Sequence, residues 1–559
     1  MESLFSSADT MWVLIAAALV FFMQAGFAMV ETGFTRAKNA GNIIMKNLMD
    51  FSIGTPVYWL IGFGIMFAGS GPLIGGIDFM VRGNYDSSFP TPAFLIFQTV
   101  FCATAATIVS GAMAERTKFS AYCIYSLIIS AFIYPVSGHW IWGDGWLAQL
   151  GFHDFAGSTA VHMVGGIASL VGAKIVGPRI GKYSQSGESR AIPGHSLTLG
   201  ALGVFILWFA WFGFNGGSTV AMTSQEDIVS ASSIFVTTNL AAATAAVFTM
   251  IITWIRYKKP DVSMTLNGAL AGLVAITAGC DAVSPFGSFC IGIVAAFVIV
   301  FGIEFVDKVL KVDDPVGAIG VHGLAGAAGT ILTGIFALDG GLAYGGGWAM
   351  VGVQALGVVS VMAWVAVTMG IVFTIIKKTI GLRVSHTEEL AGLDITEHNI
   401  ESSYADFMIA PAGADFKPYS TDDEAVPVNT AIPVVNNSKP GAKMTKITII
   451  TNQNKLTALH NALDRIGITG LTVTNVLGHG MQKGHTEYYR GAPVTMKLLP
   501  KVQVDIVVCK IPSQTVIDTV KKVLYTGKVG DGKIFVYDVE NVVKVRTGEQ
   551  GYDALQDNE

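Results

Sequence analysis

Charge is scarce in this chain. Asp, Glu, Lys and Arg together make up 13% of its 559 residues, whereas 52% of the residues are hydrophobic. Soluble proteins carry about 25% charged residues, so this composition excludes an ordinary soluble protein of this length. The net charge is −5 and no nucleic-acid-binding motif is present, so we expect no nucleic-acid partner.

Cysteine is also scarce. The chain has five cysteines, and none of them has the C-x-x-C spacing typical of metal sites. We therefore expect small apolar side chains at these positions and no metal site. Cys280 and Cys290 flank one predicted outer loop, so a disulfide between them remains an alternative. No basic segment precedes the first apolar run, which is unlike the start of a cleaved signal peptide.

Long apolar runs, in contrast, are frequent. About 11 of them reach the ~20 residues needed to cross a membrane, and their centres lie near residues 22, 58, 103, 128, 168, 207, 242, 273, 296, 328 and 363. With the N-terminus outside, every Lys and Arg up to Arg383 except Arg82 falls in an inner loop. The positive-inside rule predicts this asymmetry. We therefore predict an all-α polytopic membrane protein whose membrane part ends inside.

Two apolar segments repeat one pattern. Asp154–Gly166 and Asp314–Gly326 both fit D-x2-G-x3-V-H-x3-G. Each places one histidine, His162 or His322, about 12 Å of helix from its start. The two predicted spans run in opposite directions, which indicates an inverted 5+5 repeat and brings both imidazoles to mid-depth. Ionisable side chains at that depth usually serve a function, so we expect a shared site.

Helix packing is the alternative interpretation of this repeat. Gly165, Gly166, Gly323 and Gly326 suit close helix crossings. Packing accounts for the glycines but not for two imidazoles in an apolar environment. We therefore favour a functional histidine pair.

Four further motifs stand in the apolar part: F-Q-T-V-F at 97–101, S-G-A-M-A-E-R at 110–116, W-F-G-F-N-G-G-S at 211–218 and G-L-D-I-T-E-H-N at 392–399. With the repeat, they make about residues 10–400 resemble the ammonium transporter family. The resemblance implies an 11-helix protomer in the inner cell membrane and a homotrimer with one pore per subunit. It also implies that ammonium is the substrate, that transport needs no cofactor, and that the protein is not an enzyme.

The resemblance assigns roles at the outer end of the pore. Phe101, Trp142 and Ser218 match the outer recruitment site of the family. Aromatic faces attract a cation by about 0.5–2 kcal/mol each, and a hydroxyl accepts one N–H hydrogen bond. Phe101 and Phe214 match the stacked pair that closes the entrance.

Deeper in the pore, His162 and His322 match the twin histidines of the family. Two facing imidazoles can share one proton, because one ring donates to the other. Asp154 matches an acidic residue at the base of the outer vestibule. An Asp before a helix is usually a cap, so we expect Asp154 to orient the helix start.

The composition shifts at about residue 400. Prolines and polar residues without apolar periodicity predict a flexible linker over 401–444. A soluble domain follows over 445–559. Alternating apolar residues predict strands at 446–451, 470–476, 501–508 and 533–539, and helical spacing predicts helices at 456–466 and 513–525. The order βαββαβ predicts an α+β ferredoxin-like domain, interrupted by a long polar loop over 479–499.

Motifs in this tail resemble the PII nitrogen-regulatory proteins: G-I-T-G-L-T-V-T at 467–474, Q-K-G-H-T-E-Y-Y-R-G-A at 482–492 and T-G-K-V-G-D-G-K-I-F at 526–535. The resemblance implies a trimer that binds ADP or ATP, with Mg²⁺ and 2-oxoglutarate as further ligands. It assigns nucleotide contacts to Gly530, Gly532, Lys533, Lys544 and Arg546. It assigns 2-oxoglutarate contacts to Gln482 and Lys501, and it makes Arg490 the loop residue that plugs the inner pore exit.

The glycine-rich segment is not a Walker A loop, because Ile534 stands where that motif needs Ser or Thr. We therefore expect an ammonium transporter that is regulated in cis by its own PII-like domain. The first alternative is an ammonium sensor, in which the pore part signals through the tail. A third reading is an inverted-repeat carrier for another cation or amine.

Overall fold

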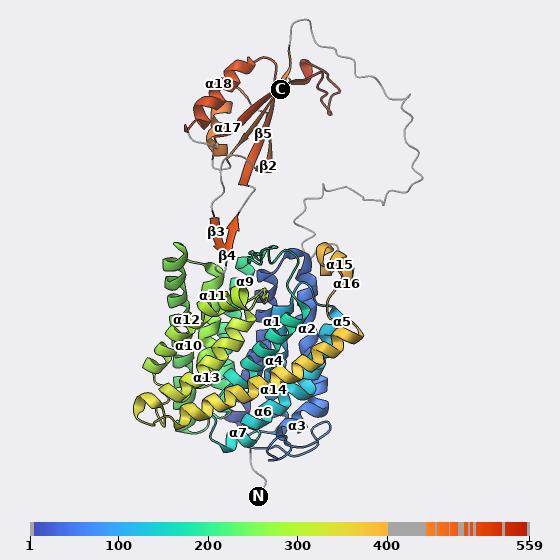
Figure 1. Ribbon diagram of the computed structural model, residues 1–559. Coiled ribbons are helices and arrows are strands. Elements are labelled where there is room, and N and C mark those ends of the chain that lie inside the picture. The colour runs from blue at the N-terminus through green and yellow to red at the C-terminus, as the bar shows by residue number, and fades with distance from the viewer. Residues whose placement is uncertain are drawn as a thin grey trace. The chain divides into compact units, whose positions relative to one another are not determined.

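The computed structural model describes residues 5–400, 443–452, 455–468, 470–478, 486–489, 492–495, 499–527 and 531–555. Gln482, Arg490 and Gly530 lie outside these residues, as does nearly all of the predicted linker. Figure 1 shows a helical unit and a small α+β unit, each of which is described by itself.

The described residues contain ten helices that are long and apolar enough to cross a membrane, and a shorter apolar helix, α11. Together they confirm the prediction of about 11 spans. The spans are α1 Ser7–Phe34; α2 Ala40–Val57 with η2 Tyr58–Gly62 and α3 Phe63–Phe67; α4 Thr91–Met113; α5 Phe119–Ile128 with η3 Ile129–Ile133, α6 Tyr134–Trp142 and α7 Trp146–Gln149; η4 Ser158–Met163 with α8 Val164–Val176; α9 Leu197–Trp211 with η5 Phe212–Gly216 and η6 Gly217–Thr219; α10 Gln225–Tyr257; α11 Val262–Ile276; α12 Pro285–Glu304 with η7 Phe305–Val309; η8 Ile319–Leu324 with α13 Ala325–Phe336; and α14 Ala349–Thr379.

The long helix α14 runs obliquely across the bundle and packs against α8 and α13 (Figure 1). Two short helices follow it, α15 His386–Ala391 and α16 Leu393–His398, and α16 packs against α2. We call the face formed by 35–39, 114–118, 177–196, 310–318 and 380–400 the inner face, because the sequence predicts these loops to lie inside. The opposite face is called the outer face.

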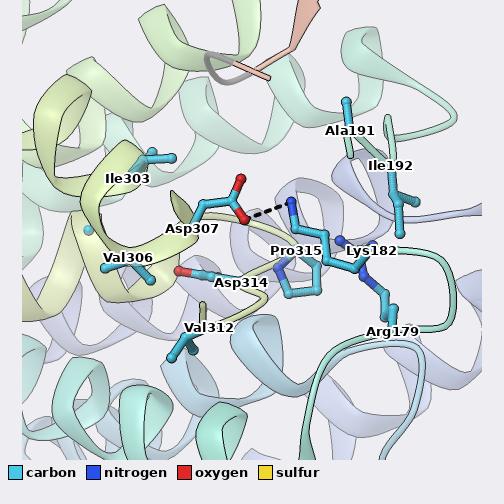
Figure 2. A pocket seen from close by; sticks show the side chains of 11 residues that line it. Arg179, Lys182, Ala191, Ile192, Ile303, Val306, Asp307, Val312, Asp314 and Pro315 are labelled. Atoms are coloured by element: carbon cyan, nitrogen blue, oxygen red, sulfur yellow. Dashed lines mark ion pairs between the residues drawn. The ribbon is translucent and has the colours of Figure 1, made fainter. Parts of the chain in front are cut away.

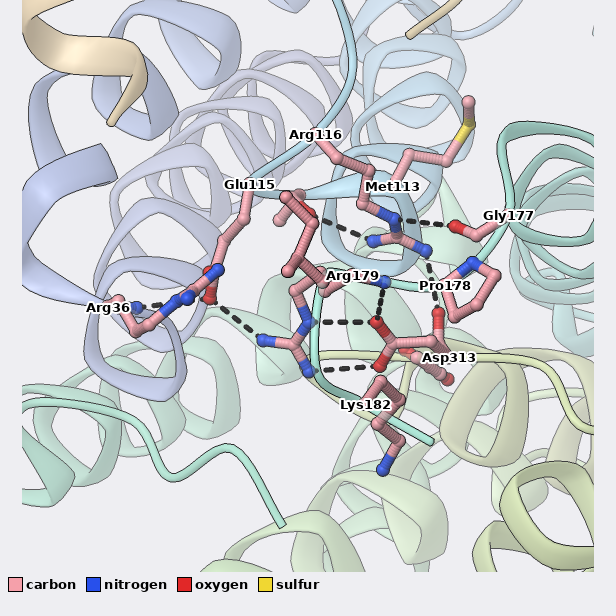
Figure 3. Close-up of polar contacts among 12 residues, drawn as sticks. Arg36, Met113, Glu115, Arg116, Gly177, Pro178, Arg179, Lys182 and Asp313 are labelled. Carbon is pink, nitrogen blue, oxygen red and sulfur yellow. Dashed lines mark hydrogen bonds and ion pairs between the residues drawn. The ribbon is translucent and has the colours of Figure 1, made fainter. Parts of the chain in front are cut away.

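Buried ion pairs join the loops of the inner face (Figure 3). The Arg179 guanidinium donates to both Asp313 carboxylate oxygens, at 2.8 and 2.9 Å, and to Glu115 at 2.8 Å. Glu115 also pairs with Arg36. Arg116 donates to the Asp313 backbone carbonyl at 2.8 Å. These contacts connect four loops that are far apart in sequence.

The two repeated segments cross at their glycines. A Cβ atom on Gly166 would lie 2.1 Å from the Gly323 backbone nitrogen. A Cβ atom on Gly326 would lie 2.6 Å from the Ser158 carbonyl oxygen. Only glycine permits this approach. The packing expected of the glycines is therefore present, and it brings the two repeats together next to their histidines.

The soluble unit has a four-stranded antiparallel sheet with the order β2-β5-β1-β6. The elements are β1 Thr445–Thr451, α17 Leu456–Arg465, β2 Thr472–Gly478, β5 Leu499–Val508, α18 Ser513–Leu524 and β6 Lys533–Asp538. These six elements confirm the predicted βαββαβ order. Central β1 pairs with β5 and β6, and alternate residues such as Ile447 and Ile449 are fully buried. The two helices cover them with residues such as Leu459 and Val520.

The structure adds one feature to the predicted long loop. A separate two-stranded sheet, β3 Thr486–Tyr489 and β4 Ala492–Thr495, follows β2 and precedes β5 along the chain. The sequence did not predict these strands, because four-residue strands in a polar segment have little apolar alternation.

Candidate functional site

A closed aromatic barrier lies toward the outer side of the helical unit. The rings of Phe101 on α4 and Phe214 on η5 stack with centroids 4.2 Å apart and planes 26° apart. Both rings are buried. Trp142 meets Phe101 edge-on, with centroids 6.1 Å apart, and its Nε1 donates to the Asp154 carbonyl oxygen at 2.7 Å. The stacked rings leave no open path between them for a hydrated ion.

Ser218 follows Phe214 by one helical turn. Its hydroxyl donates to the Phe214 carbonyl oxygen at 2.8 Å, which leaves lone pairs on Oγ free to accept. Ser218 is only partly buried, as is Trp142. The predicted recruitment residues are thus grouped beside the ring pair: Trp142 contacts Phe101, and Ser218 is bonded to Phe214.

The paired histidines adjoin this barrier. The Nδ1 atoms of His162 and His322 lie 3.2 Å apart, so one ring donates and the other accepts. His162 also lies 5.2 Å from Phe214 and stacks on Trp211, with centroids 4.9 Å apart. Phe101, Phe214, His162 and His322 therefore form one continuous row of rings. The predicted antiparallel repeat does bring both imidazoles together.

The repeated D-x2-G motif explains how each histidine is placed. The Asp154 carboxylate accepts hydrogen bonds from the backbone N–H groups of residues 157–160, at 2.8–2.9 Å. Asp314 accepts from residues 317–319 at 2.8–3.1 Å. Gly157 and Gly317 have φ values of 112° and 86°, a region that favours glycine. Each Asp thus caps the helix start that directly follows the glycine.

Both caps lead into π-helical turns, η4 and η8, which carry His162 and His322. Such turns are wider than α-helical ones and occur frequently at functional sites. Burial raises the pKa of the Asp154 carboxyl above its ordinary value, and the backbone donors act against that rise. Since those donors fill its oxygens, Asp154 anchors the helix start, as the sequence predicts.

Sequence reasoning missed several residues around the histidines. Trp211 stacks on His162, and Phe27 lies 5.9 Å from His322. Glu31 lines a cavity together with His322. A carboxyl inside the first apolar run is a signal that could have identified Glu31. Trp211 is the first residue of the W-F-G-F-N-G-G-S motif, a signal that could have identified it. Nothing local in the sequence distinguishes Phe27 from other aromatic residues in the spans.

A second hollow opens at the inner face, beside the start of the second repeat (Figure 2). Lys182 points toward Asp307, and their charged groups pair at 3.0 Å. Asp307 also accepts from the Ser189 hydroxyl at 2.6 Å. The charges of this hollow are thus satisfied within the protein, and we assign it a structural role.

In the soluble unit, three predicted ligand residues lie near the end of β1. The Lys501 ammonium donates to the Asn452 side-chain oxygen. Gly532 has a φ of 126°, and a Cβ there would lie 2.3 Å from the Ile450 carbonyl oxygen. Lys533 follows at the exposed start of β6. Lysine side chains and a close glycine backbone at one strand end suit an anionic ligand.

The remaining predicted nucleotide contacts lie after β6. The Lys544 ammonium is 3.8 Å from the Glu549 carboxylate, and Arg546 is exposed. The described contacts within one chain do not join either residue to Gly532 or Lys533. Their assignment remains a prediction.

The fold defines a multi-pass α-helical membrane protein that carries an α+β domain after its last span. The chain belongs to the Ammonium Transporter Family, whose pattern matches residues 11–404. Residues 444–549 match the Nitrogen regulatory protein P-II family. The protein is therefore an ammonium transporter with a fused P-II domain.

Individual relatives agree with this assignment. Ammonium transporter Amt2 of Archaeoglobus fulgidus is 48% identical over 415 residues, which is 70% of this chain and 87% of that protein. Ammonium transporter 1 member 3 of Solanum lycopersicum is 39% identical over 429 residues, or 71% and 93% of the two chains. Among solved structures, a chain described as Sensor Amt Protein is 41% identical with a TM-score of 0.67, covering 70% of this chain and 98% of that one. Candida albicans Mep2 is 29% identical with a TM-score of 0.63, over 69% and 88%.

Proposed function

We propose that ammonium passes the aromatic barrier and the histidine pair on its way through each protomer. The row of rings from Phe101 to His322 carries this proposal, because its order matches successive chemical steps. Trp142, Phe101 and Ser218 attract the hydrated cation and replace its water with ring faces and a hydroxyl oxygen. The stacked pair of Phe101 and Phe214 separates to admit the solute and excludes larger hydrated ions.

Beyond the barrier, the histidine pair offers polar atoms to the solute. The Nδ1–Nδ1 hydrogen bond fixes one proton between the rings, and the Nε2 atom of His162 has no hydrogen-bond partner among the described residues. That nitrogen is available to exchange a proton or a hydrogen bond with the solute. The pair thereby provides a relay across a mostly apolar section.

Ammonium-dependent currents in proteoliposomes test this assignment. We expect His162→Ala and His322→Ala to abolish ammonium current or to change its ion selectivity while the oligomer still assembles. His386→Ala is a matched control, because His386 is exposed at the start of α15. Wild-type current and selectivity in both pore variants would refute the relay.

We further propose that the protein is a homotrimer in the inner cell membrane, with its P-II domain on the cytoplasmic side. Adenine nucleotide would bind through Gly530, Gly532, Lys533, Lys544 and Arg546, with Mg²⁺ as a companion ion. 2-Oxoglutarate would bind through Gln482 and Lys501. The loop around Arg490 would then block or free the inner exit according to the ligand. Its positive charge opposes an exiting cation.

The second candidate function is ammonium sensing. One observation favours it: a solved chain described as Sensor Amt Protein aligns over 98% of its own length. In that case the helical unit would bind ammonium and the P-II domain would report it. Ammonium binding by purified wild-type protein without any ammonium current would favour the sensor.

A further inference from the structure

An internal cavity adjoins His322 and has an unusual lining. Eight of its lining residues are apolar, and the remaining three are Glu31 on α1, Asn267 on α11 and His322 itself. Glu31 and Asn267 are only 2% and 1% exposed. An apolar cavity therefore contains two buried acceptor groups next to the histidine pair.

The two acceptors are held in place but not saturated. The Glu31 carboxylate accepts from the Ser110 hydroxyl at 2.8 Å and from the Asn47 amide at 3.2 Å, both at Oε2. The Asn267 amide nitrogen donates to the Val316 carbonyl at 3.2 Å, which fixes the orientation of that amide. Asn267 Oδ1 is buried and has no hydrogen-bond partner among the described residues. Buried acceptors in proteins are almost always hydrogen-bonded, so a donor is expected to bind Asn267 Oδ1.

The charges behind the cavity are also incomplete. Lys46 and Asp50 lie one helical turn apart on α2 and are fully buried. Asp50 accepts from the hydroxyls of Tyr122 and Ser126, whereas Lys46 Nζ makes no hydrogen bond to any described residue. The Lys46 ammonium interacts with three carboxyls, those of Glu31, Glu397 and Asp50, and with one further cation, the Arg116 guanidinium. A buried carboxyl requires a proton or a cationic partner. Because the carboxyls around Lys46 outnumber the cations by one, one further cation can be bound there.

We propose that Glu31 and Asn267 form an inner binding site for a small ammonium cation, on the far side of the histidine pair from Trp142. The proposal rests on the proposed passage of ammonium along the row of rings. The N–H groups of the cation donate to the Glu31 carboxylate and to Asn267 Oδ1, and the cation replaces a proton on the carboxyl. Cation sites then flank the histidines on both sides, so a solute that loses its proton at the imidazoles regains a charged site beyond them.

Infrared difference spectroscopy of the full chain, in ammonium chloride against sodium chloride, tests binding directly. We expect an ammonium-induced shift of a carboxylate stretching band in the wild type. Glu31→Gln keeps the shape of the side chain and should remove the shift. Glu304→Gln is the matched control, because Glu304 is also a mostly buried carboxyl in a span but is bonded to Arg256 and Tyr257 outside this cavity. The control should keep the band shift.

Currents in proteoliposomes give the second measurement. With ammonium supplied at the inner face, Glu31→Gln should raise the half-saturating concentration by about 10–150-fold, as expected for loss of one charged hydrogen bond. Asn267→Leu should raise it by a smaller factor, and Glu304→Gln should leave it unchanged.

The outcomes separate this inference from the proposed passage. A wild-type ammonium current together with unchanged band shift and affinity in Glu31→Gln would overturn the inner site and leave the passage intact. A band shift that depends on Glu31, in a wild type without ammonium current, would uphold the inner site and overturn the passage. Absence of an ammonium-specific band shift in the wild type would overturn the inner site whatever the currents show.

Discussion

At the scale of single residues, the proposed chemistry of the pore depends on a few side chains whose hydrogen-bond partners define what they can do. Trp142 uses its indole N–H to fix its own position on the Asp154 carbonyl, which leaves the ring face for a cation. Ser218 donates its hydroxyl proton to the Phe214 carbonyl oxygen, so its Oγ can accept a hydrogen bond from the solute. The contacts that occupy their donors thus leave a ring face and an oxygen lone pair, which the proposed recruitment role requires.

The contribution of the indole ring can be measured directly. Trp142→Leu removes a ring worth about 0.5–2 kcal/mol to a cation, so the half-saturating ammonium concentration should rise roughly 2–30-fold. Trp254→Leu is the control, because that ring is 54% exposed on the surface of the helical unit. The dependence of the current on ammonium concentration gives the half-saturating concentration of each variant. An unchanged dependence in Trp142→Leu would contradict a recruitment role.

At the scale of elements, two kinds of contact hold the pore in shape: glycine crossings between the repeats and ion pairs between the inner loops. The crossings place the π-helical turns side by side, and the ion pairs hold the start of the second repeat. A change in either kind of contact should therefore affect the stability of the protein more directly than its transport.

The crossing of Gly166 and Gly323 gives a stability prediction. In Gly166→Ala the new methyl group would meet the Gly323 backbone nitrogen at 2.1 Å, and backbone cannot move aside cheaply. We expect a loss of about 1–3 kcal/mol and a lower melting temperature. Gly352→Ala on α14 meets nothing within 4 Å, and it should be neutral or stabilising by about 0.5–1 kcal/mol. Thermal unfolding of the detergent-solubilised protein measures both, and equal melting temperatures would contradict the close crossing.

The ion pairs of the inner face give a second prediction. Asp313→Ala leaves the buried Arg179 guanidinium without its bidentate partner and should cost about 3–5 kcal/mol. Asp339→Ala is the control, because Asp339 is exposed in an outer loop. The same unfolding measurement at neutral pH compares the two variants. A loss in Asp313→Ala no greater than in the control would contradict a stabilising network.

This pair also predicts a pH dependence. Burial alone would raise the pKa of Asp313, but the charges of Arg179 and Arg116 outweigh it and hold that pKa well below its ordinary value. The contribution of the carboxylate is therefore present above the ordinary Asp pKa of about 4 and is lost as the pH falls toward the depressed value. The wild type should lose stability below about pH 4 more steeply than Asp313→Ala.

At the scale of the whole molecule, a transporter and a regulatory domain share one chain. The proline-rich part of the predicted linker, residues 410–444, has an r.m.s. reach of roughly 30 Å. It would hold the domain near the helical unit at an effective concentration on the order of mM. Regulation by a tethered domain therefore needs only weak binding. The boundaries 1–400, 401–444 and 445–559 remain predictions from composition.

Flux with and without the tail tests regulation in cis. We compare the full chain, a truncation after Asp406, Arg490→Ala and the matched control Arg465→Ala, which changes an exposed arginine at the end of α17. ADP, ATP and 2-oxoglutarate are supplied on the tail side. We expect ligand-dependent flux in the full chain and in the control, and ligand-independent flux in the other two. If no ligand changes the flux of the full chain and truncation has no effect, the proposed block of the inner exit by Arg490 is wrong. Ammonium sensing is then the better-supported function.

The sequence alone determined the spans, their order and the βαββαβ tail. These follow from local patterns, since a stretch of apolar residues or an alternation of apolar and polar ones fixes which surface must be buried. It also paired His162 with His322, because an inverted repeat relates equivalent positions. Only the tertiary structure decided that the Nδ1 atoms meet at 3.2 Å, that Trp211 stacks on His162, and that Glu31 and Asn267 share a cavity with His322. Those facts depend on contacts between helices far apart in the chain, which no local pattern encodes.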